Sequence, residues 1–172
     1  DGPLASPVVA AAMIFPNAWS ECGFDDRLRD LNDSTQLTDT QREEFFTVLT
    51  SLPEVRYGIA IVDAATIDQI NILKATHRAM NEALAQLQPQ PEHVLVDGKP
   101  VKSMKLPHTA IVKGDALSYS ISAASVLAKV TRDRMMLEFE EEFPGYGFAE
   151  HKGYGTPQHL AVIAERGPCA IH

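Results

Sequence analysis

The stretch HVLVDGK, residues 93–99, places an aspartate at the end of a short apolar run, and the segments around it indicate the fold class. Val94, Leu95 and Val96 are typical of a strand, whereas aspartate is depleted in strands. Ligands in open α/β sheets collect just outside the carboxyl ends of strands. Asp97 is therefore a candidate site residue, with a plain turn residue as the alternative, because Asp-Gly is itself a turn signal.

Short β-rich runs alternate with longer helical runs on both sides of this strand. Strands are expected at 8–15, 55–62, 93–97 and 109–112. Helices are expected at 38–52, 66–88, 119–143 and 156–166. Alternation of this kind is typical of an α/β domain.

Local signals mark where two of these helices begin. Thr38 and Gln41 have the spacing of a capping box, and the pattern from Thr66 to Gln69 predicts the cap of one long helix. The long helix would turn one apolar face to the core, made of Ile70, Leu73, His77, Met80, Leu84 and Leu87. We interpret His77 as a core histidine.

Length and composition indicate one soluble globular domain. The chain has 172 residues, of which 45% are hydrophobic and 22% charged, enough for a full core. Its longest apolar run, residues 7–15, is under half of the roughly 20 residues that a bilayer span needs. We therefore expect a cytoplasmic protein without a membrane partner. Cys22 and Cys169 lack the spacing of a zinc site and are expected to be reduced, buried and inert.

The charge distribution favours a localised anionic ligand. The net charge of −8 argues by itself against a protein coated in nucleic acid. However, residues 97–134 carry a formal charge of +4, while the rest of the chain carries −12. One basic region on an otherwise acidic protein suits a single anionic ligand.

A second acid, Asp115, follows the short strand at 109–112 and precedes the long helix. Its alternative role is that of a partner for the helix dipole. Lys113 could hold a phosphate or pair with Asp115. Asp133 would lie roughly 20 Å along the helix axis, at about 1.5 Å per residue, so we interpret it as a salt-bridged residue on the helix surface.

The third candidate feature is the stretch GYGFAEHKGYGTPQH, residues 145–159. Its glycines, Lys152 and Tyr154 precede a helix start, which is a plausible platform for an anion and a sugar. An ordinary packed loop tyrosine is the alternative for Tyr154. His151 and His159 have no third partner at metal spacing, so zinc is not expected there.

Six segments resemble, in order and spacing, the bacterial type 2 ribonuclease H family, ribonuclease HII. They are GPLASPVVAAA, NILKATHRAMNEAL, VLVDGK, VKGD, ISAASVLAKVTRDRMM and PGYGFAEHKGYGT. The resemblance implies a ribonuclease-H-like mixed sheet flanked by helices, in a single catalytic domain over residues 1–172. It also implies a monomeric endonuclease of DNA replication and repair. Such an enzyme cuts the RNA strand of RNA–DNA hybrids and ribonucleotides embedded in duplex DNA.

The resemblance also implies roles for particular residues. Asp97 and Asp115 match two of the family's four carboxylates, which hold Mn²⁺ or Mg²⁺ for two-metal hydrolysis of a phosphodiester. Tyr154 matches the tyrosine that supports the sugar, and Gly2 matches the last glycine of the turn that reads the 2′-hydroxyl. From their positions in the sequence, Lys113 and Lys152 are also expected to bind the substrate.

The chain departs from the family pattern at both ends and in DSTQL, residues 33–37. Asp1 falls where the family has an arginine, Thr35 and Gln36 stand where it has lysines, and CAIH ends the sequence early. We therefore expect a domain that lacks its first strand, cuts slowly and dissolves poorly because strand edges are open. The alternative is a catalytically impaired hybrid-binding remnant of the same fold. A nucleotide-binding α/β enzyme has less support, because no glycine-rich phosphate fingerprint follows a strand.

Overall fold

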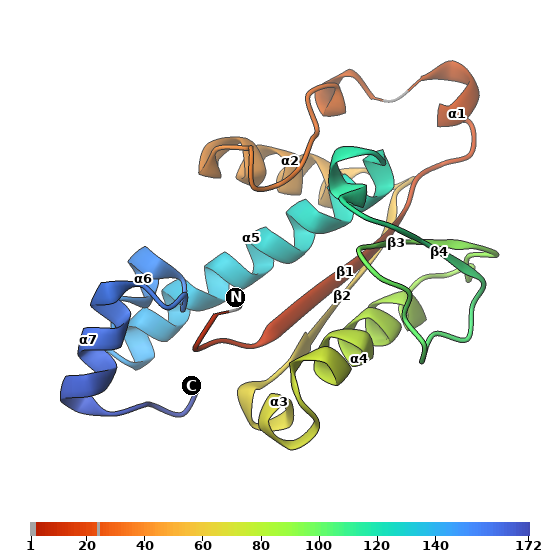
Figure 1. Cartoon of the computed structure of the whole chain (residues 1–172). Helices are drawn as coiled ribbons and strands as arrows, with labels where there is room; N and C mark the ends of the chain where they lie inside the picture. Colours follow the sequence, from red (N-terminus) through yellow and green to blue (C-terminus); the bar gives the residue numbers. More distant parts are fainter. Residues whose placement is uncertain (1–2, 24) are drawn as a thin grey trace.

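The computed structural model describes residues 3–23 and 25–172 and has helices on both sides of short strands (Figure 1). The strands are β1 (Val8–Ile14), β2 (Arg56–Val62), β3 (Val94–Asp97) and β4 (His108–Ile111). The α-helices are α1 (Trp19–Cys22), α2 (Asp39–Ser51), α3 (Ala64–Ile70), α4 (Ile72–Ala85), α5 (Tyr119–Glu142), α6 (Phe148–His151) and α7 (Pro157–Arg166). Two short 3₁₀ helices are η1 (Asp26–Leu28) and η2 (Gly114–Ala116). Every expected strand is present, within one residue of its predicted bounds.

β1 and β2 form an antiparallel pair at the centre of the fold, with Val8 opposite Val62. α4 covers one face of this pair, and α5 with α2 covers the other (Figure 1). Successive residues of a strand point to opposite faces, so Ala10 packs towards α4 and Ala11 towards α5. Small side chains on β1 let both helices approach the strands closely.

The helix expected from residue 66 is divided in two, so the prediction of one long helix is wrong. α3 is capped by Asp63, whose carboxylate accepts from the N–H of Thr66 at 2.7 Å. It ends at Asn71, which has a φ of 71° and accepts from the N–H of Lys74 at 3.1 Å to cap α4. Asparagine tolerates this left-handed backbone and is a strong N-cap, so one residue ends the first helix and begins the second.

The buried face of α4 agrees with the prediction at Leu84, with Leu87 just after the helix also buried, and differs from it at other positions. Ala75, Ala79 and Ala83 are fully buried against the strands, whereas Leu73 is 62% exposed. His77 is half-buried at the side of the helix, so its interpretation as a core histidine is wrong. The close approach of α4 to β1 selects the smallest side chains for the contact, and larger ones lie at its margins.

β3 and β4 form a parallel pair in which Asp97 lies opposite Ile111. Parallel strands bring their carboxyl ends to the same edge, and the N–H of Gly98 donates to the oxygen of Ile111 there at 2.9 Å. After β4 the chain passes Lys113, which is left-handed with a φ of 56°, and enters η2. The end of β3 and the start of η2 therefore lie side by side.

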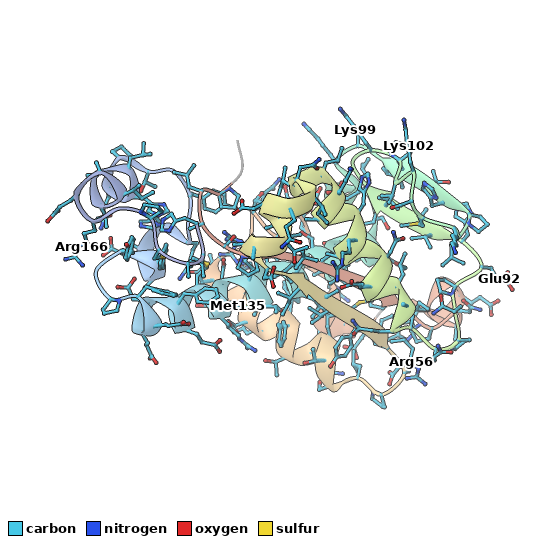
Figure 2. All side chains as sticks on the ribbon, turned by 90° about the horizontal axis from the view of Figure 1, so that it is seen from below. Arg56, Glu92, Lys99, Lys102, Met135 and Arg166 are labelled. Carbon is cyan, nitrogen blue, oxygen red and sulfur yellow. The ribbon has the colours of Figure 1, made fainter. Side chains whose placement is uncertain are left out.

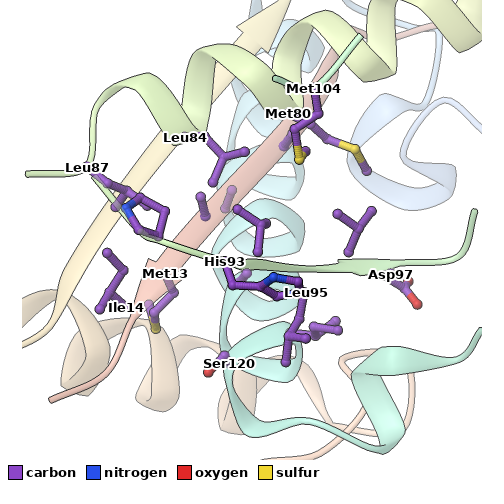
Figure 3. Close-up of a pocket in the computed structure, with 18 of the residues that line it drawn as sticks. Met13, Ile14, Met80, Leu84, Leu87, His93, Leu95, Asp97, Met104 and Ser120 are labelled. Atoms are coloured by element: carbon purple, nitrogen blue, oxygen red, sulfur yellow. The ribbon is translucent and has the colours of Figure 1, made fainter. Parts of the chain in front are cut away.

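A groove of about 710 Å³ separates the two strand pairs (Figure 3). β1 and β3 line it from opposite sides, together with residues of α4 and α5. Within the described residues each strand is paired along one edge only, β1 with β2 and β3 with β4. Figure 3 shows Met13 and Ile14 of β1 and Leu95 of β3 around this groove, with Asp97 beside it. The expected α/β fold is confirmed, and among the described residues its strands form two separate two-stranded sheets, one antiparallel and one parallel.

The C-terminal part of the chain packs around Phe148, which is fully buried together with Met136 of α5. Thr156 caps α7 through the N–H of His159 at 3.2 Å, with Pro157 in the first turn. The start of this helix agrees with the sequence prediction.

The N-terminal segment joins the same part of the fold. The N–H groups of Leu4 and Ala5 donate to the oxygen of Gly153 at 2.8 and 3.2 Å, and the N–H of Ser6 donates to Ile171 at 3.0 Å. A Cβ on Gly153 would lie 1.9 Å from the oxygen of Ala5, so only glycine allows this approach. Residues far apart in sequence therefore form one unit beside α6 and α7.

Several local predictions have direct outcomes. The capping box is confirmed, because Thr38 Oγ1 accepts from Gln41 N at 3.2 Å and Gln41 Oε1 accepts from Thr38 N at 2.9 Å. Asp133 forms the expected ion pair, with Lys129 Nζ at 2.8 Å. Cys169 is half-buried, with its Sγ 3.1 Å from His172 Nδ1, so the expectation of a buried thiol is wrong.

Two expectations remain, one for the thiol of Cys22 and one for a membrane-spanning helix. The side chain of Cys22 lies outside the part that the structure describes. Among the described residues, no helix has the length and apolar character needed to cross a membrane.

Candidate active site

Asp97 stands at the carboxyl end of β3 and is exposed to solvent. Its Oδ1 accepts a hydrogen bond of 2.8 Å from the main-chain N–H of Gly114 in η2. This bond fixes one oxygen of the carboxylate and joins the end of the strand to the turn that carries Asp115. The sequence placed these two acids at strand ends, and the parallel pairing brings those ends together.

Gly114 makes this contact possible because it has no side chain. A Cβ at this position would lie 2.6 Å from Cδ1 of Ile121 and 3.4 Å from Oδ1 of Asp97. Contacts below 3 Å between carbon atoms are strongly repulsive, so either η2 or the buried side chain of Ile121 would have to move. The glycine of the VKGD motif therefore keeps the turn against both the helix and the carboxylate.

Asp115 is half-buried in η2, and its Oδ1 accepts from the N–H of Ala116 at 3.0 Å. Burial raises the pKa of its carboxyl, and the negative charges of Asp33 and Asp97 raise it further. A carboxyl in this setting holds its proton more readily than a free one, because ionisation adds another negative charge to the cluster.

Asp33 is a member of this cluster that the sequence did not reveal. Its Oδ1 accepts from the N–H and the hydroxyl of Thr35 at 2.8 and 2.7 Å, which lowers the pKa of its carboxyl. The negative charge of Asp33 in turn raises the pKa of Asp115. The loop reaches this position through Ser34, whose hydroxyl bonds to that of Ser125 on α5 at 2.7 Å.

Basic side chains lie close in sequence to the two strand ends. Figure 2 shows Lys99 and Lys102 projecting outward from the loop that follows β3. Lys113 is exposed and stands two residues before Asp115. Among the described residues no ion pair joins Lys113 to Asp115, so its ammonium group is not engaged by that acid.

Tyr154 lies in the loop between α6 and α7 and is 43% exposed. The guanidinium carbon of Arg132 lies 5.2 Å from the centre of its ring, as in a cation–π contact. Arg132 also donates to Ser6 Oγ at 2.8 Å and to the oxygen of Lys152 at 2.7 Å. Arg132 therefore packs against the ring of Tyr154 and links it to the N-terminal segment through Ser6.

The remaining predicted binding residues have mixed outcomes. Lys152 is left-handed, with a φ of 48°, and its Nζ donates to the oxygen of Ala149 at 2.7 Å. Its ammonium group is thus used within its own loop. Gly2 lies outside the described residues. Neither Lys152 nor Tyr154 has a hydrogen bond to Asp97 or Asp115 within the described part of the chain.

Solved structures show which class of protein has this fold. The chain is similar to the ribonuclease H2 of Pyrococcus horikoshii, with a TM-score of 0.75 and 28% identity over 95% of this chain and 81% of that one. Its fold also matches a chain of the PCNA:RNase HII complex from Archaeoglobus fulgidus, with a TM-score of 0.74 and 24% identity over 99% and 86% of the two chains. The fold therefore defines an α/β domain of the ribonuclease H2 class.

Sequence comparison gives the family within this class. The family model described as Ribonuclease HII matches residues 1–172. The ribonuclease HII of Geobacter metallireducens is 51% identical over 171 residues, which are 99% of this chain and 76% of that protein. The one of Ruminiclostridium cellulolyticum is 47% identical over the same share of this chain and 64% of its own length. This chain belongs to the ribonuclease HII family, a family of endoribonucleases.

Proposed function

We propose that this chain hydrolyses the RNA strand of RNA–DNA hybrids and cuts at single ribonucleotides embedded in duplex DNA, with Asp97 and Asp115 as catalytic metal ligands. The observation that carries this proposal is the bond of 2.8 Å between Asp97 Oδ1 and the N–H of Gly114. It ties the strand-end carboxylate to the turn that bears Asp115, in a member of the ribonuclease HII family.

Mn²⁺ or Mg²⁺ suits the donor chemistry of this edge. Carboxylate oxygens are hard ligands, and Mg²⁺ commonly binds through one or two carboxylates together with substrate phosphates. The raised pKa of Asp115 supports the same assignment, because a cation would offset the charges of Asp33 and Asp97. Within the described residues no three His, Cys, Asp or Glu side chains are arranged to hold an ion. Asp97 and Asp115 would therefore supply part of a ligand set.

When bound, the metal ions activate the attacking water and stabilise the leaving oxygen. The main-chain N–H groups of this chain hold the two carboxylates in position. The N–H of Gly114 holds Asp97, and the N–H of Ala116 holds Asp115. Both carboxylates are thus oriented before substrate arrives, which lowers the entropy lost on the way to the transition state.

The ribose is read, in this proposal, by Tyr154 together with Gly2. A protein distinguishes RNA from DNA through contacts to the 2′-hydroxyl and its sugar. Tyr154 offers an exposed ring on the Arg132 guanidinium. The N-terminal segment bonds through Leu4 to Gly153, the neighbour of Tyr154, which supports a shared role for the segment that begins at Gly2.

Phosphate binding falls to Lys113 and Lys152. Lys113 is exposed beside the carboxylate turn, where an ammonium group attracts the substrate backbone. Lys152 would exchange its bond to Ala149 for a phosphate oxygen, so we expect the smaller contribution from it. The basic stretch from residue 97 to residue 134 adds long-range attraction.

Residues 1–172 belong, in this proposal, to one domain whose sheet takes one further strand. β1 and β3 present edges to the same groove of about 710 Å³, and a strand placed there could pair with both. One end of that strand would lie beside Asp97, where it could add carboxylates. Without it we expect weak metal binding, slow cleavage and poor solubility.

The enzyme acts as a monomer in the cytoplasm, in this proposal. Its partner is a nucleic acid, and the features that serve this partner lie on one chain. Light scattering should give a mass close to the 18.8 kDa of a single chain.

A cleavage assay tests the proposed function. Incubated with Mn²⁺ and a duplex that contains one ribonucleotide, the chain should cut slowly at that position. Asp97→Asn should lower the rate roughly a hundredfold or more, as expected for a group that holds the catalytic ion. Asp133→Asn is the matched control, because Asp133 is paired with Lys129 on α5. Cleavage that survives Asp97→Asn would show that the site is assigned wrongly.

A peptide tests the further strand. A synthetic apolar strand that ends in Asp-Glu should raise the cleavage rate of the chain when added in trans. The same peptide ending in Asn-Gln should raise the melting temperature equally without raising the rate. No effect of either peptide on stability would show that the groove does not take a strand.

A further inference from the structure

Three lysines stand on the loop that joins β3 to β4. They are Lys99, Lys102 and Lys105, and all three are exposed. Within the described residues no ion pair involves any of them. The proposed site assigns phosphate binding to other lysines, so these three charges have no role in it. We call these three residues the lysine row.

The loop is anchored to the body of the fold, which fixes the side on which the lysine row stands. Val101 and Met104 alternate with the lysines, are 1% and 8% exposed, and pack in one apolar cluster with residues of α4. The side chain of Asn81 on α4 donates to Ser103 Oγ at 3.0 Å. Because these anchors face inward, the lysines between them face outward. Figure 2 shows the two labelled members of the row projecting from the same side of the molecule.

The lysine row is electrostatically unfavourable in the free chain. Its members follow one another at intervals of three residues, which is at most about 10 Å of extended chain. The Debye length is also about 10 Å at 0.1 M salt, so neighbouring ammonium groups repel one another. A polyanion along the row would offset this repulsion, and release of its counterions would favour the contact.

The lysine row begins two residues after Asp97 and continues away from it. β3 and β4 are parallel, so the loop runs back from the carboxyl end of β3 to the amino end of β4. Figure 1 shows these two strands towards one end of the molecule, and α6 and α7, which flank the loop of Tyr154, at the other end. A duplex that contacts Tyr154 and Asp97 and continues in the same direction therefore reaches the lysine row.

We propose that the lysine row binds the phosphate backbone of the duplex that flanks the cleavage site, on the side of Asp97 away from Tyr154. This inference deepens the proposed function and rests on it. The row spans at most about 20 Å of chain, and DNA advances about 3.4 Å per base pair, so the contact covers about six base pairs. Phosphate contacts carry no sequence information, so the row should raise the affinity for any flanking sequence and leave ribose discrimination unchanged.

The salt dependence of binding tests the phosphate contacts. Fluorescence anisotropy gives the affinity for a duplex with one ribonucleotide between about 50 and about 200 mM salt, without divalent cation so that the duplex is not cut. Lys102→Gln should reduce the slope of log affinity against log salt by about one, and Lys102→Arg should keep the full slope. Arg56→Gln is the matched control, because it removes one exposed positive charge on the opposite side of the molecule (Figure 2). It should leave the slope unchanged.

Duplex length tests the direction of the row. The ribonucleotide fixes the register, and the duplex is extended from about four to about twelve base pairs on one side of it and then on the other. For the unmodified chain, extension on one side should raise the affinity about tenfold, as expected for three additional phosphate contacts, and extension on the other side should raise it much less. The triple variant Lys99→Gln/Lys102→Gln/Lys105→Gln should lose this one-sided gain. Its melting temperature should stay unchanged, because all three positions are exposed.

The outcomes separate this inference from the proposed function. The inference is wrong if Lys102→Gln keeps the full salt slope, or if the triple variant loses the same affinity for extension on either side. Tight binding to phosphatidylserine vesicles that the triple variant loses would assign the row to a membrane instead. If the unmodified chain binds duplexes with and without a ribonucleotide equally, the proposed reading of the ribose fails, and the salt slope still shows whether the row contacts the duplex.

Discussion

Oδ1 of Asp97 accepts a hydrogen bond of 2.8 Å from the N–H of Gly114, the residue that precedes Asp115. The bond crosses from the end of β3 to η2, so it ties Asp97 to the turn that carries Asp115, 18 positions further along the sequence. Ile121 of α5 confines Gly114 on its other side. The geometry of the carboxylate pair therefore depends on how closely η2 packs against α5.

Gly114→Ala should force η2 or the buried side chain of Ile121 to move and so disturb the bond that holds Asp97. The new Cβ would lie 2.6 Å from Cδ1 of Ile121. We expect a loss of about 1–3 kcal/mol in the free energy of unfolding, as for other overpacked sites, together with slower cleavage. The double variant Gly114→Ala/Ile121→Val removes the clashing methyl group and should recover most of both losses. Urea denaturation measures the loss of stability, and the cleavage assay measures the loss of rate. A double variant as impaired as the single one would show that the clash with Ile121 is not their cause.

The acids at strand ends could be predicted because their signal is local. Asp97 and Asp115 each follow a run of β-forming residues, and parallel pairing brings such ends to one edge. Asp33 could not be found in this way, because it lies in a loop with no periodic pattern. Its position depends on the long-range bond between Ser34 and Ser125, which no local rule predicts.

For the helices, too, local sequence signals predicted some features and missed those that depend on backbone conformation or packing. The sequence placed the beginning of α2 and α7 correctly, since their caps are Thr38 and Thr156. The break at Asn71 was missed because an asparagine within a helical pattern does not reveal its φ of 71°. The sequence predicted the burial of Leu84 and Leu87, but it favoured Leu73 for the contact with β1, where the close approach requires alanine.

Asp33→Asn should lower the pKa of Asp115, because it removes a charge that raises it. The acid limb of the cleavage rate should therefore move to lower pH, since Asp115 binds a cation only when ionised. Asparagine keeps an oxygen that can accept from the N–H of Thr35, so the loop should stay in place. A pH–rate profile measures the shift, and Asp30→Asn, an exposed acid in the same segment, is the control. An unchanged acid limb would mean that the two carboxyls do not interact in solution.

Asp115→Asn should raise the melting temperature at neutral pH when no divalent cation is present. Because the pKa of Asp115 is raised in the folded state, its contribution to stability is full at low pH and is lost as the pH rises through the carboxyl range. Asp33 acts in the opposite sense, since its lowered pKa gives stability that is lost as the pH falls. The substitution removes the unfavourable contribution that ionised Asp115 makes to the stability of the folded state at neutral pH.

The same variant should also gain less stability from Mn²⁺ than the unmodified chain, because it lacks one ligand. Scanning calorimetry with and without Mn²⁺ measures both effects. Asp68→Asn, an exposed acid on α3, should show the normal gain. A full gain in Asp115→Asn would remove Asp115 from the metal site.

Arg132 joins the parts of the fold that surround Tyr154. Its side chain is 11% exposed and donates to Ser6 Oγ and to the oxygen of Lys152, while its guanidinium lies under the Tyr154 ring. Burial lowers the pKa of this guanidinium. The buried guanidinium group therefore holds the N-terminal segment, through Ser6, against the loop between α6 and α7 that carries Tyr154.

Arg132→Lys should destabilise the fold by about 1–3 kcal/mol, because a lysine keeps the charge but cannot bond Ser6 and Lys152 with one planar fork. Ribose discrimination should fall as well, since the support beneath Tyr154 is lost. The matched control is Arg134→Lys, because Arg134 makes exposed contacts, an ion pair with Glu43 and a cation–π contact with Phe46, each worth about 1 kcal/mol or less. Urea denaturation measures the free energy of unfolding of both variants. Equal losses would show that the buried contacts of Arg132 contribute no more than the exposed contacts of Arg134 do.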